Sequence, residues 1–127
     1  MLAFSAGVFA QGGWQAPAGL RQIEIWPVGV PDMEGITLPP ERVETTKAPD
    51  VVAGRPYTAV YNVATPTMTI FPPKGKNTGV SMVVFPGGGF QLLAMDLEGT
   101  EICDWMTRKG INLCAVKISG AKEQRRL

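Results

Sequence analysis

The run Val80–Gly89, VSMVVFPGGG, is the most informative part of this chain for the expected fold. It is apolar and rich in β-branched residues, and it ends at a proline and three consecutive glycines, which is typical of a buried strand that stops at a loop. Glycines allow backbone conformations closed to other residues and let N–H groups approach a ligand without an intervening Cβ. The stretch predicts a strand and then a loop that presents N–H groups to an anion. A tight strand-to-helix turn is the simpler alternative.

The residues after this loop predict a helix and a second strand. Apolar side chains recur at helical spacing from Leu97 to Met106, and Gly110 supplies the left-handed stop that commonly ends a helix. Ile111–Ile118, INLCAVKI, is again mostly apolar. Strand, helix and strand form one βαβ unit, in which we expect the two strands to be parallel.

The residues before the loop predict shorter, antiparallel strands. Arg21–Trp26 alternates as a half-buried edge strand does, and Thr67–Phe71 is β-branched and aromatic. The polar segment Lys74–Gly79 predicts a hairpin-like turn that would place the second of these strands beside the central one. Val28–Pro56 predicts a long surface loop, and Val60–Val63 a short extended segment.

Length and composition bound the class of protein. A chain of 127 residues, 45% hydrophobic and 18% charged, is one globular domain with a packed core. Its net charge of +1 favours neither nucleic acid nor an anionic membrane as a partner, and no apolar run is long enough to span a bilayer. With two cysteines and no histidine, we expect no zinc or other metal site.

Phosphate-binding fingerprints do not fit the glycine-containing segments, so no nucleotide or other cofactor is expected. The dinucleotide pattern needs a third glycine where Leu92 stands, and Lys117 stands where an acidic residue for the ribose is expected. The P-loop pattern needs an upstream glycine and a hydroxyl residue that Gly75-Lys76-Asn77 does not have.

The two ends of the chain differ from its middle. Residues 1–20 predict a partial signal peptide and linker, because the start is apolar and Val8 and Ala10 match the small residues of a cleavage site. The expected location is therefore periplasmic or secreted, and cytoplasmic if this segment is only an apolar arm. Residues 21–118 form the expected domain, and residues 119–127 a divergent, basic tail.

Several motifs together resemble those of a known family. The chain carries PGGGF, then LAMDLEG, a helix with CDWM, a glycine and a strand with VKI, after the upstream runs IEIWPVGVP and TPTMTIFPP. These motifs are similar to those of the N-terminal part of α/β-hydrolase esterases related to acetylxylan esterases, over roughly residues 22–118. The resemblance implies a three-layer α/β-hydrolase-like fold, here incomplete, with N-terminal antiparallel strands and one βαβ unit.

The resemblance also implies a function and site residues. The family hydrolyses small acyl esters, in particular acetyl esters of plant-polysaccharide sugars, and its glycine loop supplies oxyanion-hole N–H groups. Carried over, Gly88 and Gly89 are the donors, with Gly87 and Phe90 as neighbours that shape the loop. The expected partner is a small acyl ester or acetylated carbohydrate.

Three further residues match the family's DxEG element, namely Asp96, Glu98 and Gly99. We assign them to structural support of the loop and of the helix start. An ordinary helix cap is an equal alternative for them.

The departures from the family concern catalysis itself. No G-x-S-x-G occurs, since Ser5 lies in the leader, Ser81 in a strand and Ser119 outside any such motif, and a histidine is missing. Cys103 and Cys114 are expected to be buried small residues, with a disulfide possible after export. The sequence therefore predicts an inactive N-terminal fragment of a serine carboxylesterase. The alternative is a small secreted binding or structural module without enzyme activity.

Overall fold

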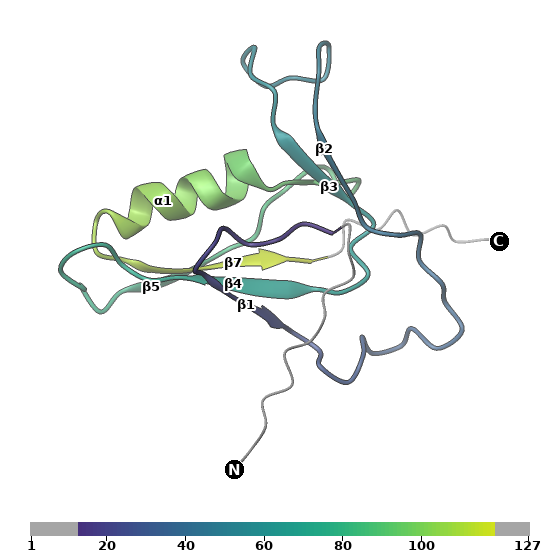
Figure 1. The fold of residues 1–127 in the computed structure, drawn as a ribbon, viewed down its shortest axis with the longest axis horizontal. Coiled ribbons are helices and arrows are strands. Elements are labelled where there is room, and N and C mark those ends of the chain that lie inside the picture. Colours follow the sequence, from purple (N-terminus) through teal and green to yellow (C-terminus); the bar gives the residue numbers. More distant parts are fainter. Residues whose placement is uncertain (1–12, 119–127) are drawn as a thin grey trace.

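The computed structural model describes residues 13–118, in which seven strands form two sheets and one short helix lies over one of them (Figure 1). The expected leader, at residues 1–10, and the tail at 119–127 lie outside the described residues. The elements are, in chain order, β1 (Arg21–Glu24), β2 (Arg42–Thr45), β3 (Thr58–Tyr61), β4 (Thr67–Phe71), β5 (Ser81–Val84), β6 (Leu93–Ala94), the π-helical turn η1 (Asp96–Thr100), α1 (Glu101–Thr107) and β7 (Asn112–Lys117).

The larger sheet has the strand order β1-β4-β7-β5. β4 is antiparallel to both of its neighbours, and β7 is parallel to β5, with Ser81 opposite Asn112 and Val84 opposite Ala115. The predicted strand–helix–strand unit with a parallel pair is therefore present. The predicted strands at Arg21–Trp26, Thr67–Phe71 and Ile111–Ile118 are confirmed as β1, β4 and β7.

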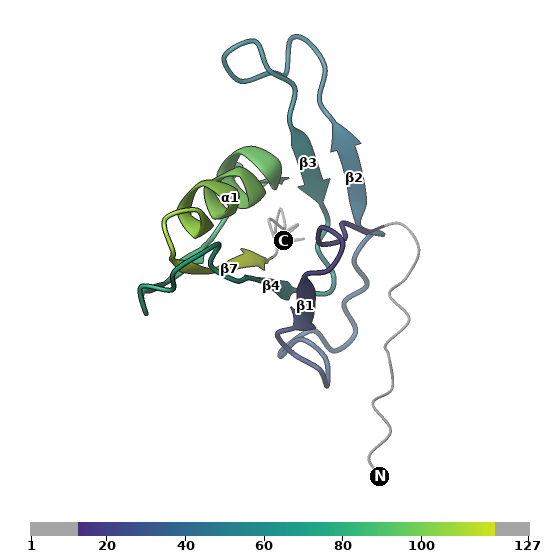
Figure 2. The ribbon, with the colours of Figure 1, turned by 60° about the vertical axis from the view of Figure 1, so that its left-hand side comes forward.

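The smaller sheet has the order β2-β3-β6 and projects away from the larger one, as Figure 2 shows. β6 belongs to the chain that leaves the glycine loop, and its two residues pair with Ala59 and Val60 of β3. The smaller sheet therefore fixes one end of the glycine loop in space.

Two clusters of buried side chains hold the fold together. One lies between α1 and the larger sheet and contains Phe71, Cys103, Leu113 and Ala115. The other lies under the smaller sheet and contains Trp14, Val60, Val63, Leu93 and Met95. The stretch expected to be a linker thus contributes a core residue, Trp14.

The predicted three-layer α/β-hydrolase-like fold is wrong. In residues 13–118 the architecture is a small β-rich domain, with two sheets and one short helix that covers a single face of the larger sheet. On the face away from α1, Ile70 and Val83 flank Cys114 in register and are 37% and 57% exposed. Local periodicity correctly indicated one βαβ unit, but a unit of this kind does not determine how many layers are built around it.

The predicted hairpin between β4 and β5 is also wrong, because β7 lies between these two strands. The connecting segment packs instead against the end of α1, where the N–H groups of Lys74 and Thr78 donate to the carbonyls of Thr107 and Gly110 at 2.8 and 2.9 Å. β5 is consequently an edge strand with exposed side chains, and not the buried central strand that its apolar composition indicated.

Three smaller differences concern single elements. The expected loop Val28–Pro56 contains β2, which carries charged residues at two of its four positions and lacks an apolar period. The expected extended segment at Val60–Val63 begins earlier, as β3. The helix begins with the π-helical turn η1, and its predicted stop is confirmed by a φ of 78° at Gly110.

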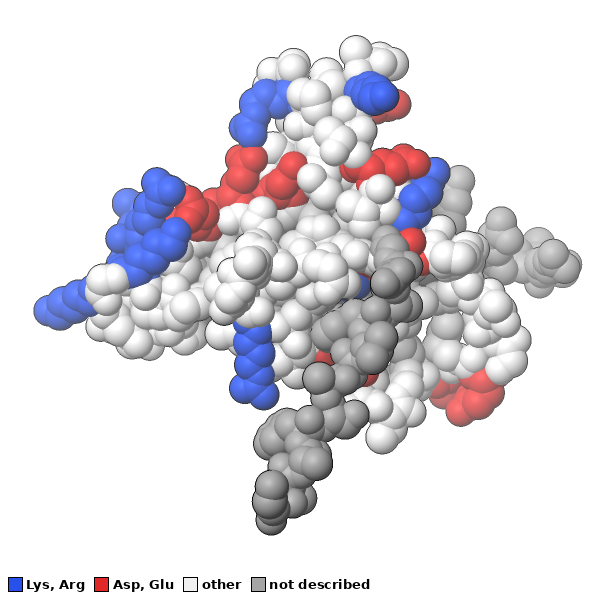
Figure 3. All heavy atoms as spheres, in the orientation of Figure 1, with Lys and Arg blue, Asp and Glu red and all other residues white. Residues whose placement is uncertain are grey.

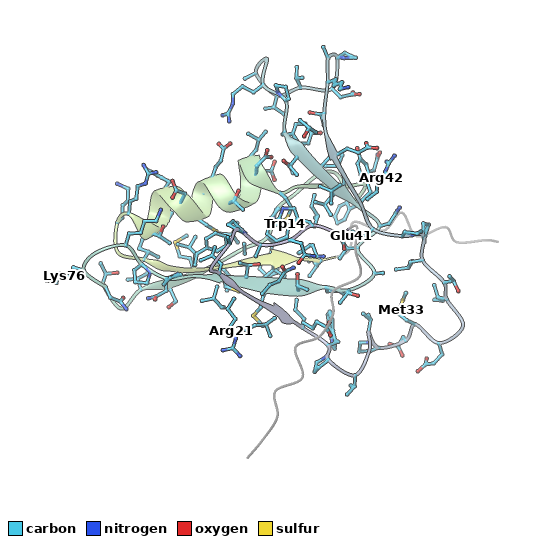
Figure 4. All side chains as sticks on the ribbon, in the orientation of Figure 1. Trp14, Arg21, Met33, Glu41, Arg42 and Lys76 are labelled. Carbon is cyan, nitrogen blue, oxygen red and sulfur yellow. The ribbon has the colours of Figure 1, made fainter. Side chains whose placement is uncertain are left out.

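A buried ion pair connects Glu41, the residue just before β2 of the smaller sheet, to Lys117 at the end of β7 in the larger sheet. The Lys117 ammonium lies 2.9 and 2.7 Å from the two carboxylate oxygens of Glu41, and both side chains are almost fully buried. The Trp14 N–H donates to the same carboxylate at 2.7 Å. Figure 4 labels Trp14 and Glu41, which lie close together between the sheets.

Candidate functional site

The candidate site is the glycine loop that follows β5. After Val84 the chain passes through Phe85 and the buried Pro86 and enters the loop at Gly87. The carbonyl of Gly87 accepts the Ala94 N–H at 2.8 Å, so the two ends of the loop are joined. The loop is therefore a closed turn between the two sheets.

Three successive residues of this loop have positive φ angles: 156° at Gly88, 62° at Gly89 and 59° at Phe90. Positive φ is uncommon outside glycine and strained for a bulky residue such as Phe90. Within residues 13–118, no acceptor forms a hydrogen bond with the N–H groups of these three residues. The loop thus holds three neighbouring N–H donors without a partner among residues 13–118, and such donors can receive an anion.

Glycine is required at Gly88 by its surroundings. A Cβ built there would lie 2.1 Å from the carbonyl oxygen of Leu92, because the chain folds back on itself. The Gly88 carbonyl accepts hydrogen bonds from the N–H groups of Gln91 and Leu92 at 3.2 and 3.3 Å, so this oxygen faces the returning part of the loop.

Glu98 holds the start of the loop. Its Oε2 accepts the Gly87 N–H at 2.7 Å, and a Cβ on Gly87 would lie only 2.6 Å from the same oxygen. Gly99 is buried against Pro86, with 3.1 Å between a built Cβ and the proline Cγ. Within the DLEG segment, Glu98 therefore contacts the loop directly, and Gly99 contacts the proline that precedes it.

Asp96 has a different role, because it binds the smaller sheet. Both of its carboxylate oxygens lie 2.8 Å from the Thr58 nitrogen, and Oδ1 also accepts the Leu97 N–H at 2.9 Å. Asp96 thus connects the start of η1 to β3. It supports the loop only indirectly, through the strand that pairs with β6.

An open cleft of about 720 Å³ lies beside the loop. This volume is within the range of about 300 to 1,000 Å³ that small-molecule sites usually have. Its lining is mostly polar and comes from β2, the segment before β3, and the loop's own continuation: Glu44, Thr45, Thr46, Lys47, Ala48, Asp50, Tyr57, Tyr61, Gln91 and Leu92. The sequence did not indicate this cleft, because it depends on the unpredicted strand β2.

The described residues contain no activated nucleophile. Ser81 is exposed on β5, in a chain without histidine. Burial, together with the neighbouring Cys114 thiol, raises the pKa of the Cys103 thiol to about 11, and burial also raises the pKa of Cys114. Both thiols are free and protonated at neutral pH, and a protonated thiol is a poor nucleophile.

Basic side chains cluster at the end of α1, away from the loop. Figure 3 shows basic groups clustered at the end of α1, where Asp104 binds both Lys74 and Arg108 and Lys109 lies over the Trp105 ring. Hydrogen bonding from Lys74, and the charges of Lys74 and Arg108, lower the pKa of Asp104. This carboxylate is therefore an ion-pair partner and a poor proton donor or acceptor near neutral pH.

In the part of the chain that the structure describes, no group of three or more His, Cys, Asp or Glu side chains is arranged to hold a metal ion. No helix between residues 13 and 118 has both the length and the apolar character needed to cross a membrane.

Comparison with known proteins assigns this chain to no family. Neither protein-family models, nor curated proteins, nor solved structures gave a match to this chain. The loop after β5, its support by Glu98 and Gly99 and the adjoining cleft are therefore the features from which a function is inferred.

Proposed function

We propose that the loop Gly87–Phe90 binds the oxyanion of an acyl ester. The chain would then supply the oxyanion-binding part of a serine carboxylesterase that acts on small acyl esters, in particular acetyl esters of plant-polysaccharide sugars. The observation that carries the proposal is the set of three successive N–H groups, at Gly88, Gly89 and Phe90, that have no acceptor among the described residues. The similarity of PGGGF and DLEG to esterase motifs supports the same function.

Preorganised donors lower the barrier of ester hydrolysis. Backbone N–H groups that are fixed before the reaction stabilise a developing oxyanion without further rearrangement, at about 3 to 4 kcal/mol per donor in measured cases. Here the loop is fixed by the Glu98 contact at one end and by the pairing of β6 at the other. The donors are therefore held in place at no cost during the reaction.

The nucleophile and proton-transfer groups of the proposed reaction are not in this sequence. It contains no histidine and no G-x-S-x-G, and the two thiols have raised pKa values. We therefore expect the 127-residue chain to hydrolyse an activated acetyl ester no faster than background. A rate within a hundredfold of that of an esterase with a complete triad would contradict this part of the proposal.

Anion binding can be measured without turnover. Methylphosphonate, a tetrahedral anion, is titrated into ¹⁵N-labelled chain while backbone amide shifts are recorded. We expect saturable shifts concentrated at Gly88, Gly89 and Phe90, because hydrogen bonding to an anion deshields the donor proton. Shifts that are absent from these three amides, or spread evenly over the basic side chains of the surface, would contradict the proposal.

A pair of glycine variants provides the matched control. Gly88→Ala introduces a Cβ at 2.1 Å from the Leu92 carbonyl oxygen and should abolish the saturable shifts by displacing the loop. Gly54→Ala also places alanine at a positive φ, 75°, but in open space and away from the loop. It should bind methylphosphonate as the unmodified chain does.

The second candidate function, a secreted binding module without activity, is favoured by one different observation. A cleft of about 710 Å³ beside α1 is lined largely by apolar and aromatic side chains, among them Phe71, Pro72, Pro73 and Trp105. It lies on the helix and not at the glycine loop. If this module function holds, ligand-induced shifts from acetylated oligosaccharides will centre on Trp105 and leave the amides of Gly88 and Gly89 unchanged.

A further inference from the structure

We propose that β5 is a dimerisation edge, at which two copies of this chain pair their β5 strands antiparallel and join their larger sheets into one. This inference is independent of the proposed esterase function. It follows from a comparison of the four sheet edges within the described residues.

Exposed sheet edges usually carry features that prevent unwanted strand pairing, such as charged side chains or very short length. β1, at the other edge of the larger sheet, has the sequence RQIE, and β2, at the edge of the smaller sheet, has RVET. Each therefore has two charges in four residues. β6, the remaining edge of the smaller sheet, is only two residues long.

β5 has none of these protective features. It pairs only with β7 within residues 13–118, and its sequence is SMVV. No charged residue occurs from Asn77 to Met95. Large apolar side chains are exposed along the edge and just beyond it, with exposed fractions of 38% at Met82, 57% at Val83 and 61% at Phe85. Such an edge combines unpaired backbone groups with apolar side chains, which is a template for another strand.

A second copy of the chain is the occupant that this edge fits. An isologous contact places the same patch on both partners, so the patch must not repel itself. The β5 edge is uncharged and the chain carries a net charge of only +1, so neither local nor overall charge opposes the contact. After pairing, the outer edges of the combined sheet are the two charged β1 strands, which stops growth at a dimer.

The contact is small, since β5 has four residues. Interfaces well below the standard size of about 800 Å² per partner are generally weak and transient. We therefore expect a dimer with a dissociation constant on the order of micromolar, visible in a concentration series. The experiment is sedimentation velocity of the full chain from about 1 to 300 µM, a range chosen to bracket that constant.

Charge variants at Val83 test the contact. Val83→Lys and Val83→Glu each place like charges at the centre of the antiparallel pair and should each give monomers throughout the concentration range. An equimolar mixture of the two should restore the dimer, because opposite charges then face each other across the pair. A variant that merely misfolds would not be rescued by mixing.

Val28→Lys is the matched control, because Val28 is an apolar residue that is 98% exposed and lies outside every strand. It should dimerise as the unmodified chain does. An unmodified chain that stays monomeric to 300 µM, a Val83→Lys variant that still dimerises, or a mixture that stays monomeric would each overturn the proposal.

Discussion

At the scale of single residues, the loop after β5 is defined by backbone conformations that its side chains do not favour. Phe90 is the informative case, because a bulky residue holds a φ of 59° while its side chain is 87% exposed. Burial therefore does not compensate the strain. Strain of this kind at an exposed residue is commonly kept where a loop has a function.

Phe90 gives a prediction about stability. Phe90→Gly should be more stable than Phe90→Ala by about 1 kcal/mol, because both variants lose the same exposed ring but only glycine adopts a positive φ without strain. Urea unfolding of the two variants measures the difference. Equal stabilities would show that the residue is not held in the left-handed region in solution.

Cys103 gives a prediction about pH. Its pKa is raised by burial from 9.0 to about 11, so between these values the thiol is protonated in the folded chain and ionised in the unfolded chain. Its contribution to stability is complete below about pH 9 and is lost as the pH rises toward 11. The loss should be on the order of 2 kcal/mol.

Unfolding experiments between pH 8 and 11 measure this loss, and Cys103→Ala is the control. The variant should show a shallower decline in unfolding free energy over that range, whatever its stability at pH 8. An identical decline in both proteins would mean that other groups cause it.

At the scale of elements, the sequence predicted most of the strands and helix ends whose residues follow a local pattern. Strands β1, β4 and β7 follow from alternation and β-branched content, and the end of the helix follows from Gly110. β2 was missed because its residues are charged and exposed, so they have no apolar period. The hairpin between β4 and β5 was wrongly predicted, because the sequence of the connecting turn does not reveal that β7 lies between these two strands.

The candidate site was predictable only where its contacts join residues that are close in sequence. The glycines and the DLEG segment are close in sequence, so the contact between Glu98 and Gly87 joins residues only 11 positions apart. The partner of Asp96 is the Thr58 N–H, 38 positions away on β3, and no local signal points to it. The cleft beside the loop was not predictable, since it needs β2 to be in place.

Asp96 gives the prediction at this scale. Asp96→Ala removes the acceptor for the N–H groups of Thr58 and Leu97 and should lower the unfolding free energy by about 1 to 3 kcal/mol. Asp96→Asn keeps one oxygen and should cost clearly less. Thermal unfolding compares them, and equal losses would mean that the carboxylate's charge matters more than its hydrogen bonds.

At the scale of the whole molecule, the buried ion pair of Glu41, just before β2, and Lys117 of β7 connects the two sheets. Removing one partner of a buried ion pair leaves an uncompensated charge, at a cost of about 3 to 5 kcal/mol. Lys117→Met should therefore destabilise the chain by an amount in this range, measured by urea unfolding.

The double variant distinguishes the ion pair from simple packing. Lys117→Met combined with Glu41→Gln should cost less than Lys117→Met alone, because the orphaned charge is removed while an acceptor for the Trp14 N–H remains. Costs that simply add would contradict the assignment of the pair as a coupled unit.

The proposed oxyanion function requires that the amides of Gly88, Gly89 and Phe90 are fixed in position to bind an anion. A crystal structure of the chain soaked with methylphosphonate would reveal whether an anion binds there. We expect a phosphonate oxygen at hydrogen-bond distance, about 2.7 to 3.1 Å, from at least two of these nitrogens, with the Glu98 contact to Gly87 intact. A phosphonate bound only at lysine and arginine side chains, or a loop whose amides donate to the protein itself, would contradict it.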